Sequence, residues 1–265
     1  WDSMNKATQG LHNGELWFIV ARMKTGKSFL IDLFAGHFWS QNLNILLVTM
    51  EMPVGKMAQR IDAIQFKMPY GDFKSGQLST DQEVEYYKKL NESKDKESKF
   101  IVAGNGRIRT VSDLSLMVEE HKPHIVMIDG FYLMRSEHVR SGNKWERVSA
   151  VADELQVLAQ RKQLPILATT QFNRGVKKGK VDADAGDVGF SYEIGQNADL
   201  LMGMFQDDTM KEEKRMLVKI MENREGENVD VLINWDLETM DFSEISVVSS
   251  SSVSSPMDKD DDIAY

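Results

Sequence analysis

Short runs of consecutive apolar residues recur along the chain and alternate with stretches of helical periodicity. Within these runs apolar and polar residues do not alternate, so each is expected to be a strand covered on both faces. The runs are LWFIVA (16–21), NILLVTM (44–50), KFIVAG (99–104), HIVMIDG (124–130), PILATTQ (165–171), DLLMGMF (199–205), RMLVKIM (215–221) and VDVLINW (229–235). Strands that alternate with helices predict an α/β fold with a mainly parallel central sheet flanked by helices.

The C-terminal part of the chain departs from this pattern in two ways. The last two runs are separated by ENREGEN (222–228), which predicts a C-terminal antiparallel hairpin. Further on, seven of the ten residues in 246–255 are serine, and the acidic DKDDD (258–262) follows. Such a segment buries too little apolar surface to offset its ordering entropy. We therefore predict one domain over residues 1–242 and a disordered Ser-rich, acidic tail over 243–265.

Composition excludes several classes of protein. The chain has 265 residues and no cysteine, which rules out disulfides, cysteine nucleophiles and cysteine-ligated metals. No apolar run reaches the ~18 residues that span a bilayer, and the opening WDSMNKATQG does not resemble a signal peptide. We therefore expect a cytoplasmic location and no membrane partner. The net charge of −9 is unlike that of a typical nucleic-acid binder, but DNA binding depends on local basic patches.

The stretch IVARMKTGKSFL (19–30) lies between an expected strand and an expected helix, where a phosphate-binding loop must lie. The usual pattern is Gly-x4-Gly-Lys-Ser/Thr, and here Ala21 takes the place of the first glycine. Backbone N–H groups and the helix dipole favour phosphate oxygens at such a helix start. The alternative is a strand, turn and helix with a chance Gly-Lys-Ser. The predicted nucleotide-binding residues are Ala21, Arg22, Met23, Lys24, Thr25, Gly26, Lys27 and Ser28.

Three further polar residues end or follow apolar runs, at the carboxyl edge where open α/β sheets bind their ligands. Glu51 could polarise a water for attack on a γ-phosphate, and Asp129 is in the expected position of a Mg²⁺-side carboxylate. Gln171 could contact the γ-phosphate and report its presence to the loop that follows. The alternatives are a solvated turn residue for Glu51 and a turn or helix-capping aspartate for Asp129.

The loop after Gln171 holds four basic residues, followed by three aspartates. Such a cluster suits the phosphate backbone of DNA, and a solvated charged loop is the alternative. Arg224 lies between the last two strands, where an arginine can reach the γ-phosphate of a neighbouring subunit or simply occupy a surface turn. The four predicted DNA-binding residues are Arg174, Lys177, Lys178 and Lys180.

In this order the motifs resemble the C-terminal ATPase domain of DnaB-type replicative helicases, a RecA-like P-loop NTPase fold, over about residues 1–242. An Ala-Arg pair that opens the phosphate loop, as Ala21 and Arg22 do here, is typical of that group. The matching stretches are GLHNGELWFIVARMKTGKS, VTMEMP, IVMIDGFYLM, ILATTQFNRGV, EIGQNADLLMG and ENREG.

The resemblance implies an ATP-dependent DNA helicase motor that uses ATP and Mg²⁺. Lys27 and Ser28 would hold phosphate and Mg²⁺, Glu51 would be the catalytic base, and Asp129 would support the Mg²⁺. Gln171 would sense the γ-phosphate. The loops that follow Asp129 and Gln171 would grip single-stranded DNA in a central channel.

The resemblance also implies that Arg224 acts in trans as an arginine finger, so hydrolysis would need a ring of subunits, expected to be a homo-hexamer. The family's primase and helicase loader are candidate further partners. Glu222 departs from the family, which commonly has a lysine there, and DVGFSYE (187–193) lacks the family's arginine-rich character. Two alternatives remain: a RecA-like strand-exchange recombinase, which disagrees with Glu51 in MEMP, and a non-catalytic nucleotide-binding assembly module, which Glu222 favours.

Overall fold

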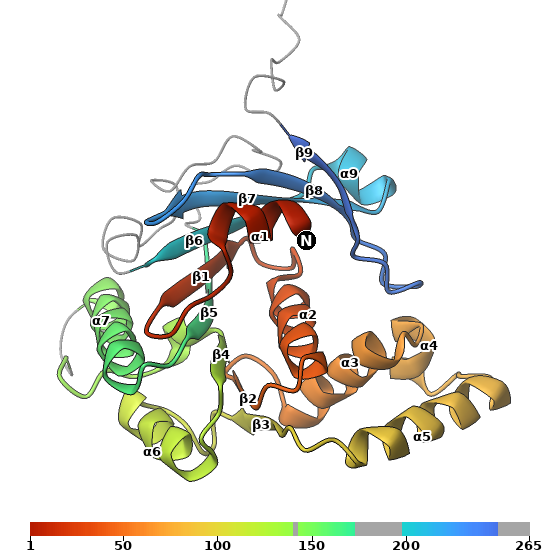
Figure 1. Ribbon diagram of the computed structural model, residues 1–265, viewed down its shortest axis with the longest axis horizontal. Coiled ribbons are helices and arrows are strands. Elements are labelled where there is room, and N and C mark those ends of the chain that lie inside the picture. The colour runs from red at the N-terminus through yellow and green to blue at the C-terminus, as the bar shows by residue number, and fades with distance from the viewer. Residues whose placement is uncertain (140–142, 173–197, 249–265) are drawn as a thin grey trace, which may run out of the picture.

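The computed structural model describes residues 1–139, 143–172 and 198–248 (Figure 1). The described residues form one nine-stranded sheet with the strand order β3-β2-β4-β5-β1-β6-β7-β8-β9. The strands are β1 Leu16–Ala21, β2 Ile45–Thr49, β3 Phe100–Gly104, β4 Ile125–Asp129, β5 Ile166–Gln171, β6 Leu200–Phe205, β7 Arg215–Asn223, β8 Asp230–Asn234 and β9 Glu244–Val248. The helices are α1 Asp2–Thr8, α2 Lys27–Ser40, α3 Val54–Phe66, α4 Tyr70–Ser75, α5 Thr80–Lys94, α6 Val111–His121, the 3₁₀ helix η1 Phe131–Leu133, α7 Lys144–Lys162 and α9 Asp208–Glu212.

Strand pairing confirms the predicted fold class. The pairs from β3 to β6 are parallel, and β1, β2, β3 and β4 are each followed by a crossover connection that contains at least one helix. The pairs β6–β7, β7–β8 and β8–β9 are antiparallel, and β7 with β8 forms the predicted hairpin. Because β1, β5, β4 and β2 are parallel neighbours, their carboxyl ends lie at the same edge of the sheet.

Both faces of the sheet are covered, which explains why the strands are apolar throughout. Successive residues of a strand point to opposite faces. In β1, Phe18 packs in the apolar layer that includes Leu155 of α7, whereas Ile19 packs in the layer that includes Leu30 of α2. Figure 1 shows α2 and α3 on one side of the parallel strands and α6 and α7 on the other. No helix in the described residues is both long enough and apolar enough to cross a membrane.

Local sequence signals explain several helix starts. Thr110 and Asp113 form a capping box at the start of α6, in which the Thr110 side chain accepts from the Asp113 backbone N–H. Ser79 and Gln82 form a second capping box, at the start of α5. These reciprocal bonds satisfy backbone donors that the first helical turn leaves without partners.

Strand β9 corrects the predicted boundary at residue 242. Residues 244–248, which the sequence assigns to the disordered tail, pair with β8 in the register Asp230–Val248 and Leu232–Ser246. The backbone of Ser3 also donates to the Glu244 carboxylate at 3.2 Å. Strand β9 is held by its hydrogen-bond ladder more than by burial, since Val247 is 50% exposed, so a criterion based on apolar burial misses it. Residues 249–265, the rest of the predicted tail, lie outside the described residues.

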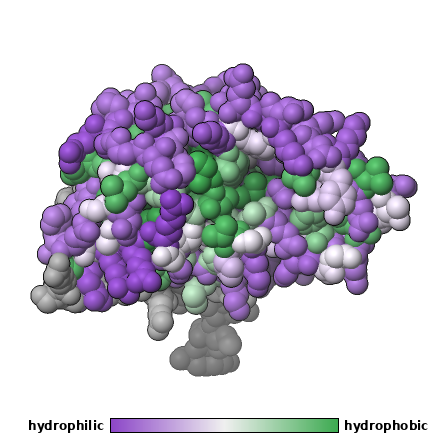
Figure 2. All heavy atoms as spheres, turned by 90° about the horizontal axis from the view of Figure 1, so that it is seen from below, coloured by the Kyte–Doolittle hydropathy of each residue, from purple (hydrophilic) through white to green (hydrophobic). Residues whose placement is uncertain are grey.

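Part of the surface is hollow and apolar. The face seen in Figure 2 is mostly hydrophilic, with hydrophobic side chains gathered near its centre. A cavity of about 210 Å³ lies between α1 and the second half of α2, and Trp1, Met4, Phe34 and Phe38 are among its lining residues. None of the predicted nucleotide-binding residues lines this cavity.

Candidate active site

The predicted phosphate loop connects β1, which ends at Ala21, to α2, which begins at Lys27. Gly26 immediately before the helix has a φ of 109°, a left-handed conformation that glycine adopts without a steric penalty. A Cβ atom at Gly26 would also lie 2.8 Å from Cζ2 of Trp235. The loop therefore requires glycine here, and its shape presents the N-terminus of α2 to an anion. Sequence reasoning did not single out Trp235, because nothing local connects β8 to this loop.

Lys27 and Glu51 are in direct contact at this loop. The Lys27 side chain is 6% exposed, and its Nζ donates to Glu51 Oε1 at 3.1 Å. Glu51 lies just beyond the end of β2, and its side chain is 28% exposed. A buried ammonium group needs a charged or polar partner, and in this structure Glu51 is that partner. The contact brings the predicted phosphate-binding lysine and the predicted base within one site.

Asp129 ends β4 and is fully buried. Its Oδ1 accepts a hydrogen bond from Thr169 Oγ1 at 2.9 Å, whereas its Oδ2 is buried without a hydrogen-bond partner among the described residues. Burial raises the pKa of Asp129, the Ser28 hydroxyl beside it lowers that pKa, and the nearby Glu51 carboxylate raises it. A buried carboxylate oxygen without a partner, next to a serine hydroxyl, is an arrangement that fits a bound Mg²⁺.

The described residues contain no cluster of three or more His, Asp or Glu side chains that could hold a metal ion alone. In a Mg²⁺ site of the nucleotide type, the protein supplies one or two oxygens, and the substrate phosphates and water supply the rest. The protein oxygens available here are those of Ser28 and Asp129.

Gln171, at the end of β5, reaches the same site through a residue that sequence reasoning missed. Its Nε2 donates to the hydroxyl of Tyr132, and that hydroxyl donates to Glu51 Oε1. Burial raises the pKa of Tyr132, and the Glu51 carboxylate raises it further, so the phenol stays protonated. The only sequence signal for Tyr132 was its place in IVMIDGFYLM, shortly after Asp129.

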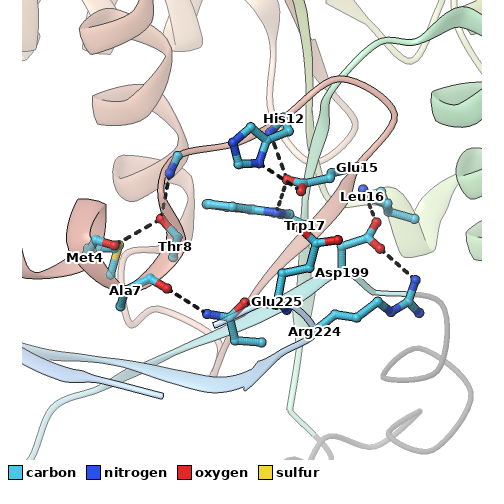
Figure 3. A network of polar contacts seen from close by, with 12 residues as sticks. Met4, Ala7, Thr8, His12, Glu15, Leu16, Trp17, Asp199, Arg224 and Glu225 are labelled. Atoms are coloured by element: carbon cyan, nitrogen blue, oxygen red, sulfur yellow. Dashed lines mark hydrogen bonds and ion pairs between the residues drawn. The ribbon is translucent and has the colours of Figure 1, made fainter. Parts of the chain in front are cut away.

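Arg224 lies at the edge of the sheet where β1 begins, opposite the edge that holds the phosphate loop. Its Nη1 is 2.8 Å from Oδ1 of Asp199, and its backbone N–H donates to the Asp199 carbonyl oxygen (Figure 3). The other Asp199 oxygen, Oδ2, accepts from the backbone N–H of Leu16, the first residue of β1. The phosphate loop follows the last residue of β1, and a six-residue strand spans about 16 Å at ~3.3 Å per residue. The structure therefore does not bring Arg224 to the phosphate loop of its own chain.

The predicted DNA-binding residues Arg174, Lys177, Lys178 and Lys180 lie outside the described residues. The structure thus brings together Lys27, Ser28, Glu51, Asp129 and Gln171, and separates them from Arg224.

Comparisons with known proteins show which proteins the chain is similar to. The chain is 25% identical over 222 residues to the replicative DNA helicase DnaB of Buchnera aphidicola subsp. Acyrthosiphon pisum, covering 80% of this chain and 47% of that protein. It is 24% identical over 236 residues to the DnaB-like replicative helicase of Enterobacteria phage T4, covering 84% and 49%. The chain therefore spans about half the length of these relatives.

Solved structures share the fold. One, of a DnaB-like replicative helicase described with its interactions with primase, superposes with a TM-score of 0.83 at 18% identity, over 93% of this chain and 61% of that chain. Another, of an ATPase domain, gives a TM-score of 0.82 at 17% identity, over 92% of this chain and 89% of that chain. The family model for the DnaB-like helicase C terminal domain matches residues 1–244. The chain belongs to this family of helicase C-terminal domains.

Proposed function

We propose that the chain is the motor domain of an ATP-dependent DNA helicase, which hydrolyses ATP to translocate on single-stranded DNA and unwind duplex during replication. The observation that carries this proposal is the contact of Lys27 with Glu51 beside the buried Asp129. A phosphate-binding cation, a water-orienting carboxylate and a Mg²⁺-side carboxylate are the parts that hydrolysis of a γ-phosphate requires.

The chemistry follows from how these side chains are held. The N-terminus of α2 and Lys27 would bind the β- and γ-phosphates of ATP. Ser28 and Asp129 would hold Mg²⁺, which supplies positive charge to the phosphate oxygens when bound. As Lys27 turns to the phosphates it leaves Glu51 Oε1, and the Glu51 carboxylate, no longer paired with that cation, can orient a water in line with the γ-phosphate.

Arg224 would complete the site of a neighbouring subunit. Its position far from its own phosphate loop supports a role in trans, where an arginine finger stabilises transition-state charge. This requires an assembly in which β7 of one subunit faces the loop of the next, and we propose a homo-hexameric ring on single-stranded DNA. A primase and a helicase loader are the further partners proposed, in the cytoplasm of a bacterial cell or phage-infected host.

The experiment is an assay of ATP hydrolysis with and without single-stranded DNA, together with unwinding of a forked duplex. The proposal predicts hydrolysis that DNA stimulates, and unwinding that requires ATP. Pairing of homologous DNA strands without unwinding would instead identify a recombinase. ATP binding without hydrolysis, whether or not DNA is present, would identify a non-catalytic assembly module.

A further inference from the structure

Tyr132 connects the two sides of the candidate site. We propose that Tyr132 is a positioning residue, which couples the γ-phosphate sensor Gln171 to the catalytic base Glu51. This inference rests on the proposed ATP hydrolysis. It concerns a residue to which the sequence motifs assigned no role of its own. In this proposal Tyr132 links the sensing of the nucleotide to the activation of water.

The strand order explains why a link is needed. Glu51 follows β2 and Gln171 ends β5, and β4 lies between these two strands. Neighbouring strands are ~4.8 Å apart, so the two backbones are separated by about 10 Å. Tyr132 belongs to η1, which directly follows β4, and its hydroxyl bonds to both side chains. A long side chain from the turn that follows the middle strand thus bridges the residues at the ends of its two neighbouring strands.

The backbone that carries Tyr132 is firmly anchored. Gly130 has a φ of 88°, and its N–H donates to Thr169 Oγ1 at 2.8 Å. Phe131 is fully buried, with its ring centre 4.9 Å from that of Phe18 in β1. These contacts fix η1 to β5 and β1, so the Tyr132 hydroxyl is held in place by the core of the sheet.

Glu51 is held against the same turn. A Cβ atom added at Gly130 would lie 2.8 Å from Glu51 Cγ, so the absence of a side chain at Gly130 makes room for the glutamate. Oε1 of the Glu51 carboxylate accepts from both Lys27 and Tyr132. When Lys27 turns to a bound phosphate, Tyr132 is the remaining partner of the two and keeps the carboxylate at its position.

The direction of the hydrogen bonds determines how a change at Gln171 affects Glu51. A phenol has a single O–H, which Tyr132 donates to Glu51, while its oxygen accepts from the Gln171 amide. Each bond in such a chain polarises the next, so donation by Gln171 strengthens the bond to Glu51. If the amide turns to a γ-phosphate oxygen, the Tyr132–Glu51 bond loses this added polarisation. Tyr132 still positions the Glu51 carboxylate, which then becomes a stronger acceptor for a water proton.

Steady-state ATP hydrolysis by Tyr132→Phe tests this inference in the full chain with single-stranded DNA present. The variant keeps the ring and loses only the hydroxyl. We expect kcat to fall about tenfold, equivalent to ~1.4 kcal/mol, with little change in KM for ATP because the hydroxyl that the variant loses bonds to Glu51 and Gln171. In a Gln171→Ala background the same change should lower kcat by less than about twofold, because coupled residues are not additive.

Tyr86→Phe is the matched control. Its hydroxyl also donates to a carboxylate, Asp62 at 2.9 Å, but outside the site, so its kcat should equal that of the unchanged chain. A Tyr132→Phe variant that is folded and retains full kcat would overturn the positioning role. The same would follow if Tyr132→Phe lowered kcat by the same factor with Gln171 present and in the Gln171→Ala background. If the unchanged chain does not hydrolyse ATP at all, it is the proposed function that fails.

Discussion

The Nζ of Lys27 lies 3.1 Å from Oε1 of Glu51, so the predicted phosphate-binding cation neutralises the predicted base. The same carboxylate oxygen accepts from Tyr132, and a buried oxygen of Asp129 without a described partner lies in the same site. In this arrangement, Lys27 would separate from Glu51 when a nucleotide binds and its phosphates attract the lysine. The following variants test the residues of this site, the glycine that shapes its phosphate loop and the proposed arginine finger.

Lys27→Met should weaken ATP binding while leaving the fold intact. Charge-assisted hydrogen bonds contribute roughly 1.5–3 kcal/mol, so we expect a loss of affinity of about 10- to 100-fold. Titration of a fluorescent ATP analogue measures it. Lys88→Met changes an exposed lysine of α5, outside the site, and is the control. Equal affinities in the two variants would contradict the role of Lys27.

Gly26→Ala should disrupt the phosphate loop. The φ of 109° strains any residue with a Cβ, and that Cβ would also meet the Trp235 ring at 2.8 Å. We expect lower thermal stability, by at least about 1 kcal/mol, together with weaker nucleotide binding. Gly55→Ala is the control, because a Cβ there meets nothing within 4 Å. A Gly26→Ala chain as stable as Gly55→Ala would show that the loop tolerates a side chain.

Asp129→Asn should abolish Mg²⁺-dependent hydrolysis but stabilise the fold near neutral pH. Burial raises the pKa of Asp129, so the folded state binds this proton more tightly than the unfolded state. Its contribution to stability therefore falls as pH rises from the unfolded pKa through the folded one. Asparagine carries no charge and can still accept from Thr169.

Thermal unfolding at several pH values checks this prediction. The stability gained by Asp129→Asn should be larger at pH 8 than at pH 4, and ~1 kcal/mol would raise Tm by about 2–4 °C. If Asp129→Asn were less stable than the unchanged chain at pH 8, the buried charge of Asp129 would not be a source of instability. Asp62 has a pKa that burial also raises, but it lies outside the site, so Asp62→Asn serves as the control for activity.

Arg224→Ala should leave ATP binding unchanged and lower hydrolysis by ~10³–10⁵, as loss of an arginine finger does in related NTPases. The Arg224–Asp199 ion pair is half-exposed on the arginine side, so its loss should change stability by less than about 1 kcal/mol. Arg107→Ala, which breaks the exposed pair with Glu120, is the control. Mixing Arg224→Ala with Lys27→Met subunits should restore part of the activity, and no restoration would argue against a trans role.

Most residues of the candidate site could be predicted because they lie at or shortly after the carboxyl ends of strands. Lys27, Glu51, Asp129 and Gln171 each end or follow an apolar run, and parallel strands bring such positions to one edge. Tyr132 and Trp235 could not be found in this way. Their contacts depend on the strand order β2-β4-β5 and on the return of β8 toward the loop, and neither follows from local periodicity. Strand β9 was not predicted because it is held by backbone pairing with β8, which composition does not reveal.

The most direct test is the rate of ATP hydrolysis per chain, measured over a range of protein concentrations with and without single-stranded DNA, for the unchanged chain and for Glu51→Gln. A site shared between subunits predicts that the rate per chain rises with concentration and with DNA. Glu51→Gln should lose ~10²–10⁴ of the rate while still binding ATP. A rate per chain that is independent of concentration and DNA, or that Glu51→Gln leaves unchanged, would contradict the account.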